Sequence, residues 1–548
     1  MKIILAAVML YAGNSFATRY AVIFKDVQNF NQLHSQWVLN DVGGLKKTFA
    51  SPFSDYQIQA SLVHVQTMVI STSRPHWNTG SGFPSTVVVE KEYFHPAPEL
   101  FRNESLTPHE FSSAWKFLST SGRAKSQTFA AAGVPWGVAA VRAPEAWALG
   151  DKGLGSRVMV LDTGIDQFHP AIEGQMEEMK DFVGDGNTPY PAADHLGHGT
   201  HVSGIILGRE LSSGFSGVAP LSMLLIGRVC SENGCSSIHV TEGINWAIEK
   251  KVDVLNLSLG SDVQTSVEKE ALARAEAAGV IVVAASGNGG KNSVGFPAAF
   301  PGVLAVGAID LNFKRASFSQ WGPELAVVAP GVEIRSSVPK GTGCRAEARL
   351  STSSSSEEVV SATCFLGSSF QKDLQKEIIP AGFGKPNEFS GQDFTGHFAL
   401  INRGEISFTE KVSNALAAHV AGVILVNNQP GLLTGGATDD GSLLSIPVIM
   451  LEQVVGEKIE AQLAQGKQSV SIKIQTSADD YSSFSGTSMA CPHVSGTMAL
   501  IRSAKKSISP EQARNILKST ATPLNPSEES GAGLINAEKA VAKALEIR

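Results

Sequence analysis

Short apolar runs alternate with segments of helical spacing from Gly133 onward. The apolar runs read as strands and cover residues 157–161, 222–229, 252–257, 280–285 and 303–309. Between them, residues 201–207, 240–251 and 266–278 have the spacing of helices. This alternation predicts an α/β fold with a parallel sheet that helices cover on both faces. Because sites in such sheets form at the carboxyl ends of the strands, Asp162 and Asn288 fall where chemistry is expected.

The N-terminal part of the chain has a different pattern. Strand-like residues 20–24, 63–70 and 86–89, with helix-like spacing over 30–39, predict a small α+β unit within residues 18–98. We find no catalytic motif in it. Residues 99–132 have no clear periodicity and are interpreted as a linker in which the precursor is processed.

Residues 1–17 have the pattern of a cleaved secretory signal peptide. Lys2 precedes the apolar residues 3–11, and small residues flank the expected cleavage point at Ala17. The alternative is a buried N-terminal strand. Because no later apolar run reaches about 18 residues, no membrane span is predicted. We therefore expect an exported protein, either extracellular or periplasmic.

Size, charge and cysteine content narrow these interpretations. At 548 residues the chain is long enough for about three to four domains. Its net charge of −7 provides no basic surface for nucleic acid. In an oxidising compartment Cys230 could bridge to Cys235 and Cys344 to Cys364, which leaves Cys491 as a buried structural thiol.

The stretch SGTSMACPHVSG, residues 485–496, places Ser488 near the start of a predicted buried helix with Pro492 in its first turn. The free amides and positive dipole end of such a helix stabilise negative charge beside the hydroxyl. Ser488 is therefore a candidate nucleophile for acyl transfer. The alternative is an ordinary serine N-cap.

Three other motifs supply the partners that such a nucleophile needs. LDTGID carries Asp162 at a strand end, GHGTHVSG carries His198 at a helix start, and AASGNGG presents Asn288. Attack on a peptide carbonyl requires an imidazole that takes the hydroxyl proton and a carboxylate that orients the imidazole. An amide side chain can donate to the oxyanion of the tetrahedral intermediate.

With these motifs in the order Asp, His, Ser, the chain resembles the subtilisin-like serine peptidases over residues 135–341 and 482–541. The resemblance implies Asp162, His198 and Ser488 as the triad, with Asn288 in the oxyanion hole. It also implies that substrate pairs with Ser258, Leu259 and Gly260, and that Ala284, Ala285 and Ser286 line the primary specificity pocket. That lining is small and apolar, so the expected substrates are polypeptides with a large apolar residue before the scissile bond.

The resemblance extends to the flanking segments. The α+β unit of residues 18–98 resembles an inhibitory propeptide, and the alternative is an ordinary N-terminal domain. The catalytic domain would comprise residues 133–340 and 481–548, interrupted by residues 341–480. This insertion is too long for a loop, and its strand and helix patterns at 396–428 and 445–463 resemble a protease-associated domain. It would border the cleft and restrict substrates, or else be passive.

Other functions compete with this interpretation. His195, His198 and His201 recur every three residues, but no HExxH motif or cysteine pair accompanies them, so we expect no catalytic metal. Asp166, like His169 and His201, is interpreted as structural. A non-catalytic peptide-binding or inhibitory homologue remains the alternative from another class. An esterase would carry GxSxG, whereas Ser488 lies in GTSMA.

The sequence leaves a structural calcium ion unassigned. Members of the family place an aspartate nine residues after the catalytic one, and this chain has Ala171 there. The loop ELSSGFSG also lacks the asparagine that would supply an oxygen ligand. We expect no cofactor to be required for catalysis.

Overall fold

The structure is a computed structural model that describes residues 18–24, 57–62, 67–72, 87–91, 93–95 and 134–547, apart from gaps in the last range. The gaps are 187–189, 213, 232, 353–354, 366, 407, 429–431, 433–436, 439–442 and 465–469. The predicted signal peptide, linker and helix at 30–39 lie outside the described residues. No described helix is long and apolar enough to cross a membrane.

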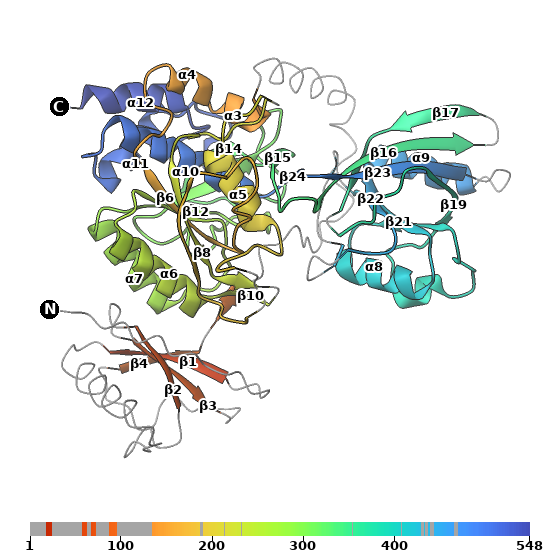
Figure 1. Cartoon of the computed structure of the whole chain (residues 1–548), viewed down its shortest axis with the longest axis horizontal. Coiled ribbons are helices and arrows are strands. Elements are labelled where there is room, and N and C mark those ends of the chain that lie inside the picture. The colour runs from red at the N-terminus through yellow and green to blue at the C-terminus, as the bar shows by residue number, and fades with distance from the viewer. Residues whose placement is uncertain are drawn as a thin grey trace. The chain divides into compact units, whose positions relative to one another are not determined.

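The N-terminal unit contains an antiparallel sheet in the order β2-β3-β1-β4 (Figure 1). Its strands are β1 Thr18–Phe24, β2 Gln57–Leu62, β3 Thr67–Thr72 and β4 Val87–Lys91. The strands expected at 20–24 and 86–89 correspond to β1 and β4. The expected strand at 63–70 overlaps β3, and β2, whose sequence QIQASL alternates polar and apolar residues, was not predicted.

A parallel seven-stranded sheet organises the main unit, in the order β14-β13-β12-β11-β6-β8-β7. The strands are β6 Arg157–Asp162, β7 Met176–Asp181, β8 Met223–Arg228, β11 Val254–Leu257, β12 Ile281–Ala285, β13 Leu304–Ile309 and β14 Leu325–Pro330. All five predicted runs form strands of this sheet. The charged edge strand β7, MEEMKD, was not predicted, because only a strand buried on both faces reads as a continuous apolar run.

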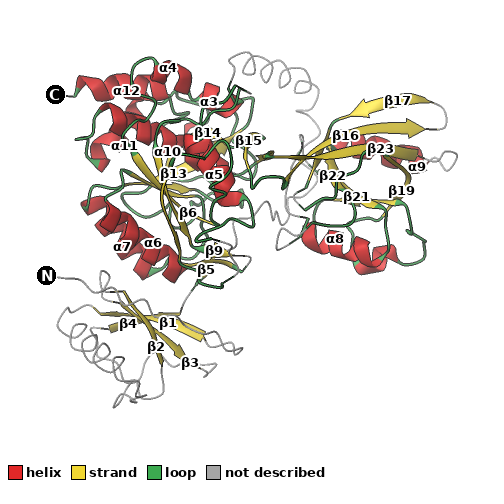
Figure 2. Ribbon diagram, viewed as in Figure 1, coloured by secondary structure: helices red, strands yellow, loops and turns green. Residues whose placement is uncertain are grey.

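Helices cover the sheet on both sides, so the predicted α/β class is confirmed. Helix α10 packs against β11–β14 and α5, whereas α6 packs against β6 on the other side (Figures 1 and 2). The described helices of this domain are α3 Trp136–Ala140, α4 Ala143–Trp147, α5 His198–Leu207, α6 Ser237–Lys250, α7 Ser266–Ala277, α10 Thr487–Ala504, α11 Pro510–Thr520 and α12 Ala537–Glu546. Helix α10 is buried from Thr487 to Arg502, which makes it the centre of the domain.

The insertion leaves this domain after β15, Ile334–Ser337, and returns through β24, Tyr481–Phe484. These two strands pair antiparallel. Beyond them lies an eight-stranded sheet in the order β17-β16-β23-β19-β20-β21-β22-β18. Its strands are β16 Gly343–Thr352, β17 Ser355–Val360, β18 Ala362–Cys364, β19 Leu374–Pro380, β20 Phe398–Asn402, β21 Gly422–Val426, β22 Val448–Leu451 and β23 Val470–Asp479.

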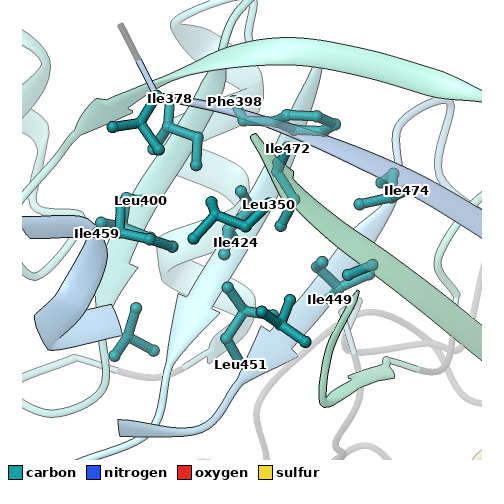
Figure 3. Close-up of a cluster of buried hydrophobic side chains, with 14 of the residues drawn as sticks. Leu350, Ile378, Phe398, Leu400, Ile424, Ile449, Leu451, Ile459, Ile472 and Ile474 are labelled. Carbon is teal, nitrogen blue, oxygen red and sulfur yellow. The ribbon is translucent and has the colours of Figure 1, made fainter. Parts of the chain in front are cut away.

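The inserted domain has its own apolar core. Helices α8, Phe408–Ala417, and α9, Gln453–Ala464, follow β20 and β22. Figure 3 shows Leu350, Ile424, Ile472 and other aliphatic side chains of this core. A separate core is what allows an insertion of this length to fold within another domain.

Two disulfides form among the described cysteines. Cys230 bonds to Cys235 across the short strands β9, Cys230–Ser231, and β10, Gly234–Ser236. Cys344 bonds to Cys364 and joins β16 to β18 within the insertion. Both pairs are ones that the sequence left open as possible bridges, and Cys491 is free and buried, as expected.

The separate core of the insertion predicts a local effect of core truncation. Ile424 is fully buried in β21, and an Ile→Ala change in such a site costs about 2–5 kcal/mol. We expect Ile424→Ala to accelerate amide hydrogen exchange in β20–β22 and to leave β11–β13 unchanged. Val359→Ala is the control, because Val359 is 68% exposed. Equal acceleration in β11–β13 would show that the two domains unfold together.

Candidate active site

Asp162 and His198 meet at the carboxyl end of β6. Oδ1 of Asp162 lies 2.7 Å from Nδ1 of His198 and also accepts the amide of Thr163 at 2.8 Å. Both side chains are buried. Since a carboxylate can only accept, Nδ1 carries the hydrogen and Nε2 is left as the acceptor. Among the described residues, Nε2 of His198 has no hydrogen-bond partner.

Glycines in the motifs LDTGID and GHGTHVSG explain how the end of β6 and the start of α5 approach so closely. A Cβ added to Gly199 would lie 2.2 Å from the carbonyl oxygen of Gly164. Gly164 itself has φ of +117°, and a Cβ there would lie 2.4 Å from the Ala192 oxygen. The backbone after β6 therefore contacts the first turn of α5 directly. This contact brings His198 to Asp162.

Ser488 is the second residue of α10, which begins at Thr487. Its hydroxyl donates to the carbonyl of Ser258 at 3.0 Å, and the hydroxyl of Ser258 donates to the carbonyl of Ser488 at 2.9 Å. Pro492 explains the second bond. It lacks the amide that would bond the carbonyl four residues earlier, so the Ser488 carbonyl is free for Ser258. Pro492 lies in the second turn of α10, one turn later than predicted.

Asn288 follows β12 and faces the start of α10. Its Oδ1 accepts from the amide of Thr487 at 2.9 Å and from the Thr487 hydroxyl at 2.8 Å. An amide N–H can only donate, so it fixes Oδ1 on the Thr487 side. Nδ2 of Asn288 and the amide nitrogen of Ser488 both lie 3.6 Å from where a Cβ on Gly486 would be, so the two donors are close to one another.

The candidate substrate-binding residues extend from two neighbouring strands. Ser258, Leu259 and Gly260 follow β11 directly, and Ala284 and Ala285 end β12. A Cβ on Gly260 would lie 2.7 Å from the Phe296 oxygen, so only glycine fits there. The sixth candidate, Ser286, is buried and donates to the Gln320 carbonyl. The structure thus places all six at the carboxyl ends of two adjacent strands, at the end of the sheet that carries Asp162.

Comparisons with known proteins agree with this geometry. The sequence pattern described as "Subtilase family" matches residues 153–369 and 454–533, more than half of the chain, and "PA domain" matches residues 355–459. This chain belongs to the subtilase family. It is a subtilisin-like serine endopeptidase with an inserted protease-associated domain.

Several individual subtilases are similar to it. Subtilisin Savinase of Lederbergia lenta is 43% identical over 211 residues, which are 38% of this chain and 76% of that protein. The major intracellular serine protease of Bacillus subtilis (strain 168) is 40% identical over 214 residues, 38% of this chain and 67% of that one. The crystal structure of the psychrophilic subtilisin-like protease Apa1 from the Antarctic psychrotroph Pseudoalteromonas sp. AS-11 has a TM-score of 0.51 and 26% identity. It covers 75% of this chain and 97% of that chain.

The subtilase site also contains supporting residues that sequence reasoning missed. Asn256 of β11 is buried; its Nδ2 donates to Ser258, and its Oδ1 accepts from Ser495 of α10. The Cys491 sulfur also lies 3.3 Å from this oxygen, and burial raises the pKa of its thiol to about 12. The only sequence signal for Asn256 is a polar residue inside an apolar strand.

The other histidines of the motifs have structural hydrogen bonds. His201 stacks on Phe484 and bonds the Ser482 carbonyl through Nε2. Burial lowers the pKa of His201 to about 3 and that of His493 to about 4, so both imidazoles are uncharged at neutral pH. His195 is exposed. No group of three or more His, Cys, Asp or Glu within the described residues is placed to hold a metal ion.

The loops at the expected calcium position do not fit that ion well. Ala171 is buried and has no carboxylate, and its carbonyl accepts the amide of Arg209. Calcium requires several oxygen ligands, and charged ones hold it best. We derive no catalytic step through a metal.

The contact between Gly199 and Gly164 gives a test of the site's construction. Gly199→Ala should push α5 away from the end of β6 and lower kcat by about 10²-fold, since small displacements of catalytic groups have effects of that size. Steady-state kinetics on a chromogenic peptide measures this. Gly150→Ala is the matched control, because a Cβ there meets only Val541 at 3.8 Å. Equal activity of the two variants would contradict the steric argument.

Proposed function

We propose that this protein is an exported serine endopeptidase that cleaves polypeptides through an acyl-enzyme on Ser488. The observation that carries the proposal is the 2.7 Å hydrogen bond between buried Asp162 and His198, which leaves Nε2 of His198 as the acceptor. Asp162 then holds the imidazole in one tautomer and stabilises its charged form. No cofactor takes part in this chemistry.

The reaction requires one rotation of the Ser488 side chain. Its hydroxyl moves from the Ser258 carbonyl to Nε2 of His198, which takes the proton as Oγ attacks the peptide carbonyl. Nδ2 of Asn288 and the amide of Ser488 donate to the oxyanion. The imidazolium then protonates the leaving amine. Water enters, gives its proton to His198, and attacks the acyl-enzyme to release the carboxylic acid product.

Substrate is proposed to bind as an added strand beside Ser258, Leu259 and Gly260. Main-chain pairing of this kind gives affinity without reading side chains. Ala284, Ala285 and Ser286 are proposed to line the primary specificity pocket, whose small walls favour a large apolar side chain before the scissile bond. The inserted domain is proposed to restrict which polypeptides reach Ser488, since β24 leads into the serine motif.

The chain is further proposed to be a self-processing precursor inhibited by its own propeptide. Strand β5, Phe94–His95, pairs antiparallel with β10. His95 is buried, and its Nδ1 lies 3.1 Å from the hydroxyl of Ser261, the residue after Gly260. Residues 94–95 therefore lie next to the stretch 258–260, beside which substrate is proposed to bind. This position supports the role of the N-terminal region as an intramolecular inhibitor. Export would follow from the predicted signal peptide of residues 1–17.

Removing the nucleophile tests both the hydrolysis and the processing. Ser488→Ala should abolish casein hydrolysis and fluorophosphonate labelling, because no other group forms the acyl-enzyme. It should also leave the precursor at full length on a gel. A wild-type sample treated with a serine-protease inhibitor is the control. Normal maturation of the variant expressed alone would contradict self-processing, and persistent labelling would contradict the assignment of Ser488.

A second variant tests the oxyanion donor. In subtilisin the loss of one such donor lowers kcat about 10²–10³-fold, and by analogy we expect a similar loss for Asn288→Leu with little change in KM. Steady-state kinetics on one peptide substrate separates the two constants. A large rise in KM at normal kcat would instead assign Asn288 to substrate binding.

A further inference from the structure

A buried carboxylate, Asp194, lies in the loop that precedes α5, four residues before His198. Asp194 is 6% exposed. The backbone next to it is joined to the segment after β6: Ile165 bridges to Ala193, and the amide of Asp194 donates to the Ile165 carbonyl. Asp194 is thus placed between the strand end that carries Asp162 and the helix that carries His198.

The two oxygens of Asp194 accept five hydrogen bonds, all from neutral donors. Oδ1 accepts from the hydroxyl of Thr163 at 2.8 Å, the amide of Gly197 at 2.8 Å and the amide of Leu196 at 3.1 Å. Oδ2 accepts from the amide of Thr200 at 2.9 Å and from its hydroxyl at 2.7 Å. These donors lie next to Asp162 on one side and on both sides of His198 on the other.

Thr163 completes the connection. Its hydroxyl donates to Asp194 and accepts the amide of Gly199, while its own amide donates to Asp162. Thr163, directly after Asp162, and Gly199, directly after His198, are therefore joined by a hydrogen bond through the Thr163 hydroxyl. The contact between Gly164 and Gly199 permits this approach sterically, but only the hydrogen bonds hold it.

We propose that Asp194 is a positioning residue that sets the geometry of the Asp162–His198 pair. This assignment rests on the proposed triad. The catalytic bond at 2.7 Å needs two backbone segments held in register, and the side chains of Asp194 and Thr163 add hydrogen bonds between them to the backbone bonds of Ile165. A charged acceptor suits the task, because hydrogen bonds to a buried carboxylate are stronger than those to neutral groups.

Asp194→Asn tests the role with almost no change in volume. An amide has one accepting oxygen, so whichever way it turns, at least two of the five donors lose their acceptor. We expect kcat to fall about 10²-fold with KM within about twofold, as for a misplaced catalytic group.

The matched control is Asp253→Asn. Asp253 is also buried, and it accepts from the amide of Arg157 and from Lys506, but it precedes β11 and so lies at the opposite end of the sheet. Its variant should keep the wild-type kcat whatever it does to thermal stability.

A spectroscopic readout separates positioning from general stability. The proton between Nδ1 of His198 and Asp162 should give a far-downfield NMR signal in the wild-type protein. We expect Asp194→Asn to shift or broaden this signal and Asp253→Asn to preserve it. If Asp194→Asn does not fold, Thr163→Val and Thr163→Ser test the same hydrogen bonds. The valine variant lacks the hydroxyl and should lose activity, whereas the serine variant retains the hydroxyl and should remain active.

If Asp194→Asn has the same kcat and the same downfield signal as Asp253→Asn, the positioning role is wrong. Equal activity of Thr163→Val and Thr163→Ser overturns it as well. Failure of the proposed function looks different, because Ser488→Ala would then remain active. An inactive Ser488→Ala with an unaffected Asp194→Asn refutes only the positioning role of Asp194.

Discussion

The hydrogen bond between Asp162 and His198 constrains the rest of the catalytic domain. Both groups are buried, so water cannot replace either partner, and an error in their separation would leave a carboxylate unpaired inside the protein. The fold meets this constraint with backbone contacts. The end of β6 and the start of α5 touch through two glycines, and no longer side chain lies between them. The catalytic pair thus depends on two residues that have no side chains.

The same logic governs the position of Ser488. Ser488 lies in the first turn of a helix that is buried from Thr487 to Arg502, and its hydroxyl still has to move during the reaction. Pro492 reconciles these demands because it frees the Ser488 carbonyl, which then bonds Ser258 and fixes the backbone. The side chain remains able to rotate. Asn256 extends this support from β11 to α10 through Ser495.

Much of this architecture could be predicted from the sequence, and the misses have physical causes. Strands buried on both faces appear as apolar runs, whereas β23 alternates buried residues with half-buried or exposed ones and contains lysine and serine, so it has no such run and was not predicted. The apolar spacing predicted helix α5 only from residue 201, because the first residues of the helix are polar or small, whereas the GHGTHVSG motif correctly placed His198 at the helix start. Motifs identified the candidate site residues. Asn256 was missed because its partner Ser495 lies 239 residues away in sequence, and the role of Thr163 and Asp194 was missed because their shared hydrogen bond joins residues 31 positions apart.

The inserted domain is connected to the candidate site through its two linking strands. Ser336 and Ser337 of β15 donate to the carbonyls of His201 and Thr200 in α5, and His201 bonds the Ser482 carbonyl of β24. Strand β24 then ends at Phe484, four residues before Ser488. The ribbon that carries the insertion therefore contacts the helix of His198 and leads directly into the helix of Ser488. An insertion at this point has to keep β15 and β24 in register, because a slip of one residue would shift Ser488 relative to Ser258. The four antiparallel pairs of this ribbon are thus a requirement of the site as well as a connection between domains.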